Sequence, residues 1–207
     1  MTLLQVHWDH VGEPLDFRQS NFVIGHGALE LLKGSSTSLR GSHSFFEPDL
    51  LPESRTTQLP NPYEPGNPPN RKVDGKIDGP DFTQDWVPHG SLPRVLDIFR
   101  DGSVLIVDAP GHLPGHINIL ARTGPDTSVY LAGDACHDRR IVRREREIGE
   151  WRDDEGHICC IHGDKKLAEQ TIERIRELEK QGVEVIFAHD VEWEENPVNK
   201  NRFLGAS

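Results

Sequence analysis

Apolar positions recur at helical spacing between residues 165 and 181, and this pattern predicts the longest helix of the chain. The apolar stripe consists of Leu167, Thr171, Ile175 and Leu178. Asp164 is placed to cap the N-terminus of this helix, and Gly182 is placed to end it. The apolar run 183–188 then predicts a strand. A helix that leads directly into a strand is typical of an α/β fold.

Shorter apolar runs predict further strands upstream of that helix. Turn signals such as Asp101-Gly102 and Pro110-Gly111 separate one run from the next. The predicted strands cover 104–107, 116–121 and 128–131, with two edge strands at 86–87 and 95–99. A short helix is expected over 28–33, directly before Gly34.

The segment 47–93 differs from the rest of the chain in its proline content. It holds 10 of the 15 prolines, together with turn-forming Asn-Pro, Pro-Gly and Asp-Gly pairs. Proline interrupts helices and is unwelcome in central strands. We therefore predict a long loop within a single domain that spans 1–207, and we expect this loop to form much of the wall of a substrate pocket.

The charge balance limits the classes of partner. The 34 acidic and 23 basic residues give a net charge of −11, which argues against a nucleic acid or an anionic membrane as partner. No run of about 18 apolar residues is present that could span a membrane. The three cysteines, Cys136, Cys159 and Cys160, form a poor disulfide framework, so we expect a reducing, cytoplasmic setting. A homodimer stays open.

Potential metal ligands gather in four short segments that follow strands or open turns. Zinc in proteins takes imidazole nitrogens and carboxylate oxygens, and one carboxylate can bridge two ions. Any single segment is most simply explained as a surface pair or an ordinary turn, but the ordered set is hard to explain in that way. The segments are His7-Trp8-Asp9-His10, Gly111-His112-Leu113-Pro114-Gly115-His116, Gly133-Asp134-Ala135 and Ala188-His189-Asp190.

In this order the four segments resemble the motifs of the metallo-β-lactamase superfamily, and within it the N-acyl homoserine lactone lactonase-like branch. That branch carries His-x-His-x-Asp-His-x-Gly, Pro-Gly-His-x-x-Gly-His, Gly-Asp-Ala and a late strand end similar to Gly-His-Asp. The matching positions run from residue 5 to residue 190. The resemblance implies an αββα sandwich, here missing N-terminal strands, with a two-zinc site at the mouth between its two sheets.

The resemblance also implies roles for the matching residues. The implied ligands are His7 and His116 for a first Zn²⁺, Asp9, His10 and His189 for a second, and Asp134 as the bridge. Asp9 would also transfer protons, and His137 stands where the family often has a tyrosine that contacts the substrate. Asp9, Asp134 and His137 are therefore the expected catalytic residues. His112 is expected to shape its turn and not to bind metal.

The N-terminal part departs from the family pattern. Gln5 stands where the first motif has its first histidine, so the first metal site should bind weakly, because an amide is a poor zinc ligand beside imidazole. Members of this fold have several strands before that motif, whereas this chain has almost nothing there. Our hypothesis is that Met1–Gln5 is a misplaced start and that the protein continues upstream.

Other residues near the motifs receive structural interpretations. Trp8 is expected to pack against the wall of the site, and the charged run 139–147 is expected to form a solvated helix face. His26, His43 and His89 are expected to be surface residues in loops, and His157 and His162, which flank Cys159-Cys160, are expected to belong to a buried strand end.

The expected function is hydrolysis of a lactone or related cyclic ester, with a small acyl compound as substrate and a metal-bound hydroxide as the attacking group. A thioesterase or a cyclic-amide hydrolase of the same fold would use the same attack. Two further alternatives stay open: a catalytically impaired remnant, which Gln5 indicates, and a two-iron redox protein of the same fold. Metal analysis separates the hydrolase, the remnant and the redox protein, because they would hold zinc, no metal and iron, respectively.

Overall fold

The structure is a computed structural model that describes residues 1–34, 39, 43, 45–64 and 79–202. Its largest element is a six-stranded sheet with the strand order β10-β7-β6-β5-β4-β3. Neighbouring strands are antiparallel except for the parallel pair β10 and β7. The strands are β3 (Val87–His89), β4 (Leu92–Asp97), β5 (Val104–Asp108), β6 (Ile117–Arg122), β7 (Ser128–Gly133) and β10 (Glu184–Phe187).

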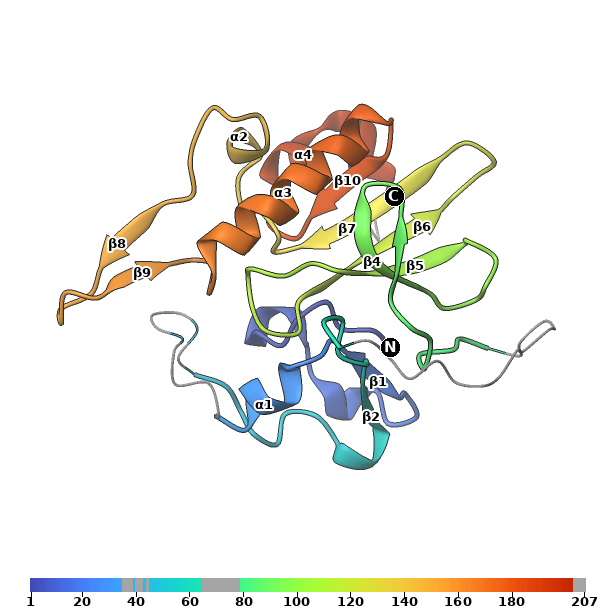
Figure 1. Cartoon of the computed structure of the whole chain (residues 1–207), viewed down its shortest axis with the longest axis horizontal. Helices are drawn as coiled ribbons and strands as arrows, with labels where there is room; N and C mark the ends of the chain where they lie inside the picture. The colour runs from blue at the N-terminus through green and yellow to red at the C-terminus, as the bar shows by residue number, and fades with distance from the viewer. Residues whose placement is uncertain (35–38, 40–42, 44, 65–78, 203–207) are drawn as a thin grey trace.

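Helix α3 (Lys165–Lys180) covers one face of this sheet (Figure 1). The Asp164 carboxylate accepts a hydrogen bond from the backbone N–H of Leu167 at 2.9 Å, and Gly182 follows the helix with φ of +84°. The predicted helix, its cap and its end are therefore confirmed. Its apolar stripe packs on the sheet in the largest core cluster, which also receives α2 (Arg139–Val142) through Val142.

The other face of the sheet packs on a smaller, parallel sheet of β1 (Phe22–Ile24) and β2 (Thr56–Gln58), and α1 (Ala28–Leu32) lies beyond it (Figure 1). Side chains alternate along β5, since Leu105 and Val107 belong to the cluster with α3 and Ile106 to the cluster with β1. A third cluster joins α1 to β1. The order of layers is thus helix, sheet, sheet, helix, which confirms the expected αββα sandwich.

The N-terminal segment lies between the two sheets. The Leu3 backbone N–H donates to the Val23 carbonyl of β1, and the Ile117 N–H of β6 donates to the Leu4 carbonyl, each at 2.9 Å. Leu3 and Gln5 are almost fully buried there. This segment therefore delivers the first predicted motif, which begins at Gln5, to the rim where the two sheets meet.

The remaining elements are short. A hairpin of β8 (Glu150–Arg152) and β9 (Ile158–Cys160) precedes α3, and α4 (Val191–Glu195) follows β10. Within the described ranges, 3₁₀ helices include Trp8–His10, Pro14–Asp16, Glu53–Arg55 and Pro197–Arg202. The predicted loop 47–93 contains β2, β3 and one of these 3₁₀ helices, while its residues 65–78 lie outside the described part of the chain.

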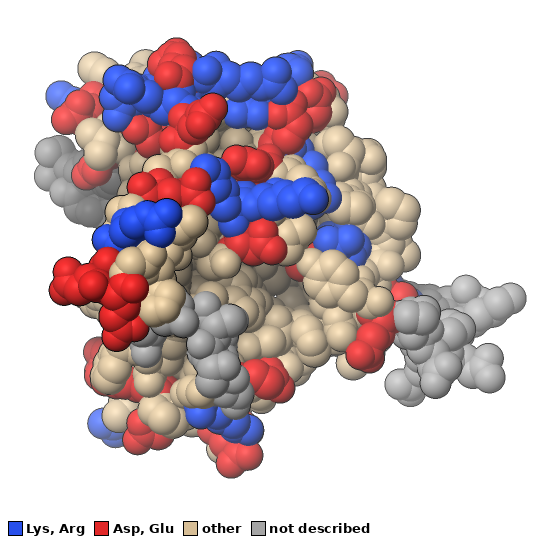
Figure 2. Space-filling view, turned by 60° about the vertical axis from the view of Figure 1, so that its left-hand side comes forward, with Lys and Arg blue, Asp and Glu red and all other residues tan. Residues whose placement is uncertain are grey.

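The surface carries charges of both signs. Figure 2 shows positive and negative side chains interleaved on one face, which is hollowed near its middle. Some of these charges form ion pairs at the surface, such as Arg143 with Glu192 and Arg144 with Glu173. None of the helices in the described residues is long and apolar enough to cross a membrane.

Candidate metal centre

Two glycines shape the turn that carries His112. Gly111 has φ of +123°, and a Cβ there would lie 2.2 Å from the backbone nitrogen of Ala168 in α3. Gly115 has φ of +78°, and its Cβ would lie 2.8 Å from the Ala28 side chain of α1. Only glycine fits such close approaches at positive φ. The turn is therefore held between the two helices, and His112 is fixed inside with 2% of its surface exposed.

The other segments reach the same place from the ends of strands. Asp134 follows β7 directly, and the Ala188 backbone N–H donates to the Gly133 carbonyl at 2.9 Å, which extends the pairing of β10 with β7. Because these strands are parallel, His189 and Asp134 emerge at the same edge of the sheet. The 3₁₀ helix Trp8–His10 places Asp9 and His10 opposite them.

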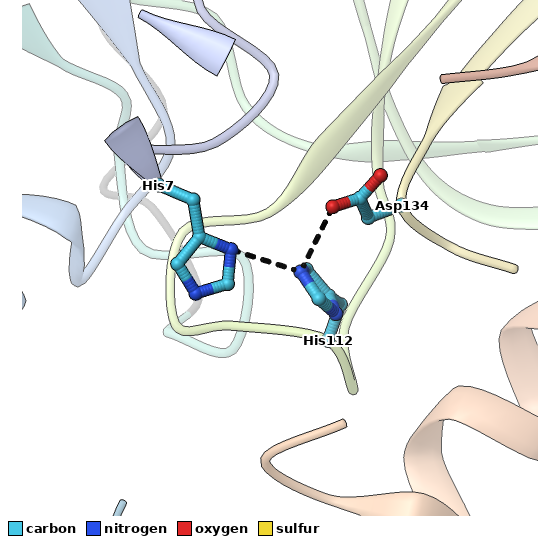
Figure 3. A group of neighbouring side chains, drawn as sticks. All are labelled: His7, His112 and Asp134. Carbon is cyan, nitrogen blue, oxygen red and sulfur yellow. Dashed lines mark hydrogen bonds and ion pairs between the residues drawn. The ribbon is translucent and has the colours of Figure 1, made fainter. Parts of the chain in front are cut away.

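A first group of candidate ligands consists of His7, His112 and Asp134. The His112 Nε2 lies 3.2 Å from the His7 Nδ1 and 3.3 Å from an Asp134 carboxylate oxygen (Figure 3). Ligand atoms at about 2.0–2.1 Å from a tetrahedral zinc lie about 3.3–3.4 Å from one another. The observed separations therefore suit a shared cation.

A second group consists of Asp9, His10 and His189. The His10 Nε2 lies 3.4 Å from an Asp9 carboxylate oxygen, and the His189 Nε2 lies 3.6 Å from the same oxygen. Asp134 adjoins this group as well, since its Oδ2 is 3.1 Å from His10 and its Oδ1 is 3.4 Å from His189. Asp134 thus stands between the two groups, where a bridging ligand is needed.

The structure places His112, and not His116, in the first group. The His116 Nδ1 lies 3.1 Å from the Ala109 carbonyl, and its Nε2 accepts a hydrogen bond from the Asp134 backbone N–H at 3.2 Å. Both ring nitrogens therefore serve the backbone, and His116 supports Asp134 from behind. The sequence predicted His116 as a ligand and His112 as a residue that only shapes the turn, whereas in the structure the ring of His112, and not that of His116, faces His7.

His137 completes a third, overlapping group with Asp134 and His189. Its Nε2 lies 3.4 Å from the Asp134 Oδ2, and its side chain is 19% exposed. The ring stacks against His189, with centroids 5.6 Å apart and planes 12° apart. His137 therefore lies at the open side of the centre, where the sequence predicted a residue that contacts substrate.

Gln5 lies against the bridging carboxylate. Its amide Nε2 donates to the Asp134 Oδ2 at 2.6 Å, and its side-chain carbonyl is buried without a hydrogen-bond partner among the described residues. An unpartnered buried carbonyl is costly in free energy unless something else binds it. An oxygen that faces a cation would remove this cost, but an amide oxygen is a weaker zinc ligand than the imidazole that the motif predicts at this position.

The surroundings of His7, His112 and Asp134 favour the protonation states that bind metal. Burial lowers the pKa of His7 to about 4, with a further contribution from His43, and lowers that of His112 to about 3. Burial opposes ionisation of Asp134, but hydrogen bonds from His10, His112 and His137 outweigh it and hold the pKa of this carboxyl well below its usual range. Neutral imidazoles and an ionised carboxylate are the forms that ligate divalent cations.

Two further buried histidines lie beside the centre: His43, which the sequence placed on the surface, and His162, which it placed at a buried strand end without a role at the centre. His43 and His162 are each 3% exposed. The His43 Nδ1 lies 3.1 Å from the His7 Nε2, and the His162 ring lies 5.3 Å from the His112 ring between centroids. The count of 11 histidines was the signal that could have indicated them. Trp8 was expected to pack against the site, but it is 84% exposed, so this expectation was wrong.

Comparison with known proteins gives sequence relatives, and this chain matches only part of the length of each. No family model matches the chain. It is similar to the cytochrome P450 monooxygenase mpaDE′ of Penicillium brevicompactum, with 30% identity over 201 residues, which are 89% of this chain and 21% of that protein. It is also similar to the metallo-hydrolase mfmC of Annulohypoxylon moriforme, with 46% identity over 50 residues, 23% of this chain and 13% of that one. The γ-lactamase FDB1 of Fusarium pseudograminearum is 25% identical over 134 residues, 63% of this chain and 27% of that one.

Solved structures with the same arrangement define the fold. An AiiA mutant from B. thuringiensis with N-decanoyl-L-homoserine bound matches with a TM-score of 0.53 and 19% identity, over 94% of this chain and 56% of that one. The dizinc lactonase AidC matches with a TM-score of 0.53 and 11% identity, over 91% of this chain and 56% of that one. The hydrolase AbOPH of the β-lactamase superfamily matches with a TM-score of 0.50 and 15% identity, over 90% of this chain and 55% of that one. The chain therefore has the metallo-β-lactamase fold. It spans about a fifth of the Penicillium protein and just over half of these solved chains.

Proposed function

We propose that this chain is a zinc-dependent hydrolase, or the metal-binding part of one, that opens a lactone or related cyclic ester. The observation that carries the proposal is the convergence of two ligand groups on Asp134, with His7 and His112 on one side and His10 and His189 on the other. The named lactonases among the solved structures and the named hydrolases among the relatives support this class of reaction.

The donor set fits zinc. Nitrogen and carboxylate oxygen at tetrahedral separations are typical of this ion, and His7, His112 and Asp134 would hold the first, with Asp9, His10, His189 and Asp134 around the second. Two such cations would acidify a bound water and polarise the carbonyl under attack. Gln5 leaves the first site with one imidazole fewer than the motif predicts, so we expect the second site to bind more tightly.

The side chains at the open side of the centre would handle the proton and the substrate oxygen. Asp9 has 34% of its side chain exposed, and it would accept the proton that attack releases and return it to the leaving alkoxide. His137 would donate a hydrogen bond to the ring oxygen or carbonyl of the substrate. A cavity of about 420 Å³ adjoins both His137 and His189, which is room for a small acyl compound. Another, of about 430 Å³, is lined by Pro62, Tyr63 and His112, so that part of the segment 47–93 borders the centre.

The name of the Penicillium relative does not favour oxygenation by this chain. The haem iron of P450 enzymes is held by a cysteine thiolate, whereas the centre described here is made of imidazoles and carboxylates. This chain corresponds to only a fifth of that protein. We therefore propose hydrolysis, and not a haem reaction, for this chain.

The experiment is metal analysis paired with a substrate panel. We expect the purified chain to bind zinc and to open lactones, detected as acid release with a pH indicator. Asp134→Asn and His10→Ala should abolish both, whereas His89→Ala, at an exposed position on β3, should leave both unchanged. Iron in place of zinc would contradict the hydrolase, and zinc without lactone opening would contradict the substrate class.

A second candidate function is hydrolysis of a cyclic amide. The similarity to a γ-lactamase over 63% of this chain favours it. The same panel should include γ-lactams and thioesters. Faster turnover of a lactam than of the lactone with the same ring would replace the first proposal by this one.

A further inference from the structure

His43 lies against the candidate metal centre without belonging to any of the ligand groups. It is 3% exposed, and its Nδ1 lies 3.1 Å from the Nε2 of His7, which is a hydrogen-bond distance. The two rings are nearly parallel, with planes 21° apart. The opposite nitrogen of His7, Nδ1, is the one that lies 3.2 Å from the His112 Nε2 within the first ligand group.

The two nitrogens of an imidazole point in different directions, so a single ion can take only one of them. If the His7 Nδ1 faces the ion, its lone pair must be free, because a ligating histidine is neutral. The one ring proton of His7 then resides on Nε2, the atom that faces His43. His43 must accept this proton's hydrogen bond through its own Nδ1.

We propose that His43 is a positioning residue for the first metal site, which accepts a hydrogen bond from the His7 Nε2–H and so fixes His7 in the tautomer that offers Nδ1 to the ion. The role is general for metal-binding histidines, whose second nitrogen donates to a carboxylate, carbonyl or water. Here an imidazole supplies the acceptor. This inference rests on the proposed metal centre but not on the identity of the substrate.

The polar contacts of His43 support a role for its Nδ1. Its Nε2 is buried without a hydrogen-bond partner among the described residues, so the contact of Nδ1 with His7 is the one that orients the ring. Phe46 flanks His7, with ring centroids 5.6 Å apart and planes 12° apart. His7 is thus held by His43 and Phe46, which restricts its rotation about χ2. The site that has lost one imidazole at Gln5 depends on this restraint more than a complete site would.

The test is zinc affinity, measured by competition with a chelating dye and without substrate. His43→Phe keeps a ring beside His7 but removes the acceptor, and we expect it to weaken first-site zinc binding by about 10–100-fold. His43→Gln keeps a side-chain acceptor and should recover most of this loss. His89→Phe, on the exposed strand β3, is the matched control and should bind zinc as the unaltered chain does. Equal affinity in His43→Phe and the unaltered chain, or equal weakness in His43→Gln and His43→Phe, overturns the proposal.

A second measurement needs no variant. In ¹⁵N spectra of the histidine rings of the zinc-loaded chain, His7 should carry its proton on Nε2 and bind through Nδ1. Zinc on the Nε2 of His7 overturns the proposal even if the variants fail to fold. If zinc binds and His43→Phe weakens it, but no lactone is opened, the proposed function fails while this inference stands. If lactones are opened and His43→Phe changes nothing, the reverse holds.

Discussion

Whether a histidine at this centre can bind a metal depends on whether a ring nitrogen is free of backbone hydrogen bonds, and its place in a motif does not decide this. His112 and His116 are four residues apart in one turn and are almost equally buried, at 2% and 1% exposure. The sequence alone could not separate them, because the direction of each ring depends on backbone partners that lie elsewhere in the chain. For His116 these are the Ala109 carbonyl and the Asp134 N–H, which together occupy both nitrogens.

This difference predicts opposite phenotypes for two similar substitutions. His112→Gln should remove first-site zinc because it deletes a ligand, whether or not the unfolding free energy of the metal-free chain changes. His116→Gln should keep zinc but lower that free energy by about 1–3 kcal/mol, since it leaves buried backbone groups without partners. Elemental analysis and urea unfolding of the two variants check this. Loss of zinc in His116→Gln alone would restore the assignment made from the motif.

At Gln5 we predict a substitution that increases the zinc affinity of the first site. Gln5→His should raise first-site zinc affinity by at least about tenfold, because imidazole is a better zinc ligand than an amide and the side chain at this position already reaches Asp134. Gln5→Leu is the control, since it removes the bond to Asp134 without adding a ligand, and it should show no gain. The measurement is the same zinc titration. An affinity for Gln5→His no higher than for Gln5→Leu would mean that this position does not reach the ion.

Elements with a long periodic pattern were predictable, whereas most three-residue strands were not; the exception is β3, where the sequence predicted an edge strand at 86–87. The pattern over 165–181 gave α3 together with its cap, and the runs that became β5, β6, β7 and β10 agree with the structure within two residues at each end. The strands β1, β2, β8 and β9 have three residues each, which is too few to show a period of two. They exist because a partner strand pairs with them, and that information is not local. The charged run 139–147 was likewise misjudged at its first residue, since Arg139 turns inward.

Arg139 connects the elements that carry His189. Its guanidinium binds both oxygens of Asp190, which begins α4, and also contacts Glu179 of α3 and the Val185 carbonyl of β10. Asp190 is only 8% exposed. An ionised carboxylate that loses its partner at such a site is strongly destabilising.

We therefore expect Arg139→Met to lower the unfolding free energy by about 3–5 kcal/mol and to weaken zinc binding through His189. Arg140→Met is the matched control, because Arg140 pairs with Asp138 at the surface with 52% of its side chain exposed, and a solvent-exposed pair contributes little to stability. Urea unfolding, with the m-value checked to be unchanged, measures the stability of both variants. A loss in Arg139→Met no larger than in Arg140→Met would show that the Asp190 carboxylate does not depend on Arg139.

Across the whole molecule, the fold buries several histidine rings around one centre, and this burial makes the stability of the metal-free chain depend on pH. His7, His112, His116 and His162 are held neutral by burial, with pKa values lowered to about 4, 3, 3 and 3. Two of these are proposed ligands, and the other two surround them. The layers of the sandwich place them together at the rim between the two sheets, although they are distributed from one end of the sequence to residue 162.

This arrangement predicts that the metal-free chain loses stability on acidification well above the pH at which carboxylates titrate. A histidine with a lowered pKa in the folded state takes up its proton only on unfolding, so its contribution is complete above pH 6.5 and falls as the pH drops toward the folded value. Each such histidine can remove up to about 1.4 kcal/mol per pH unit in this window. His10 acts in the opposite sense, because Asp134 raises its pKa against the effect of burial, but it is one residue against five, since burial lowers the pKa of His43 as well.

The measurement is urea unfolding in the presence of a chelator between pH 7.5 and pH 5. The unfolding free energy should fall steadily below about pH 6.5. His162→Phe removes one buried imidazole that is not a proposed ligand, so unfolding should take up at most one proton fewer and the slope against pH should be smaller. His89→Phe, whose imidazole is exposed, should leave the slope unchanged. A stability that is flat from pH 7.5 to pH 5 would mean that these rings are accessible to protons in the folded chain, and that the interior of the centre is open to water.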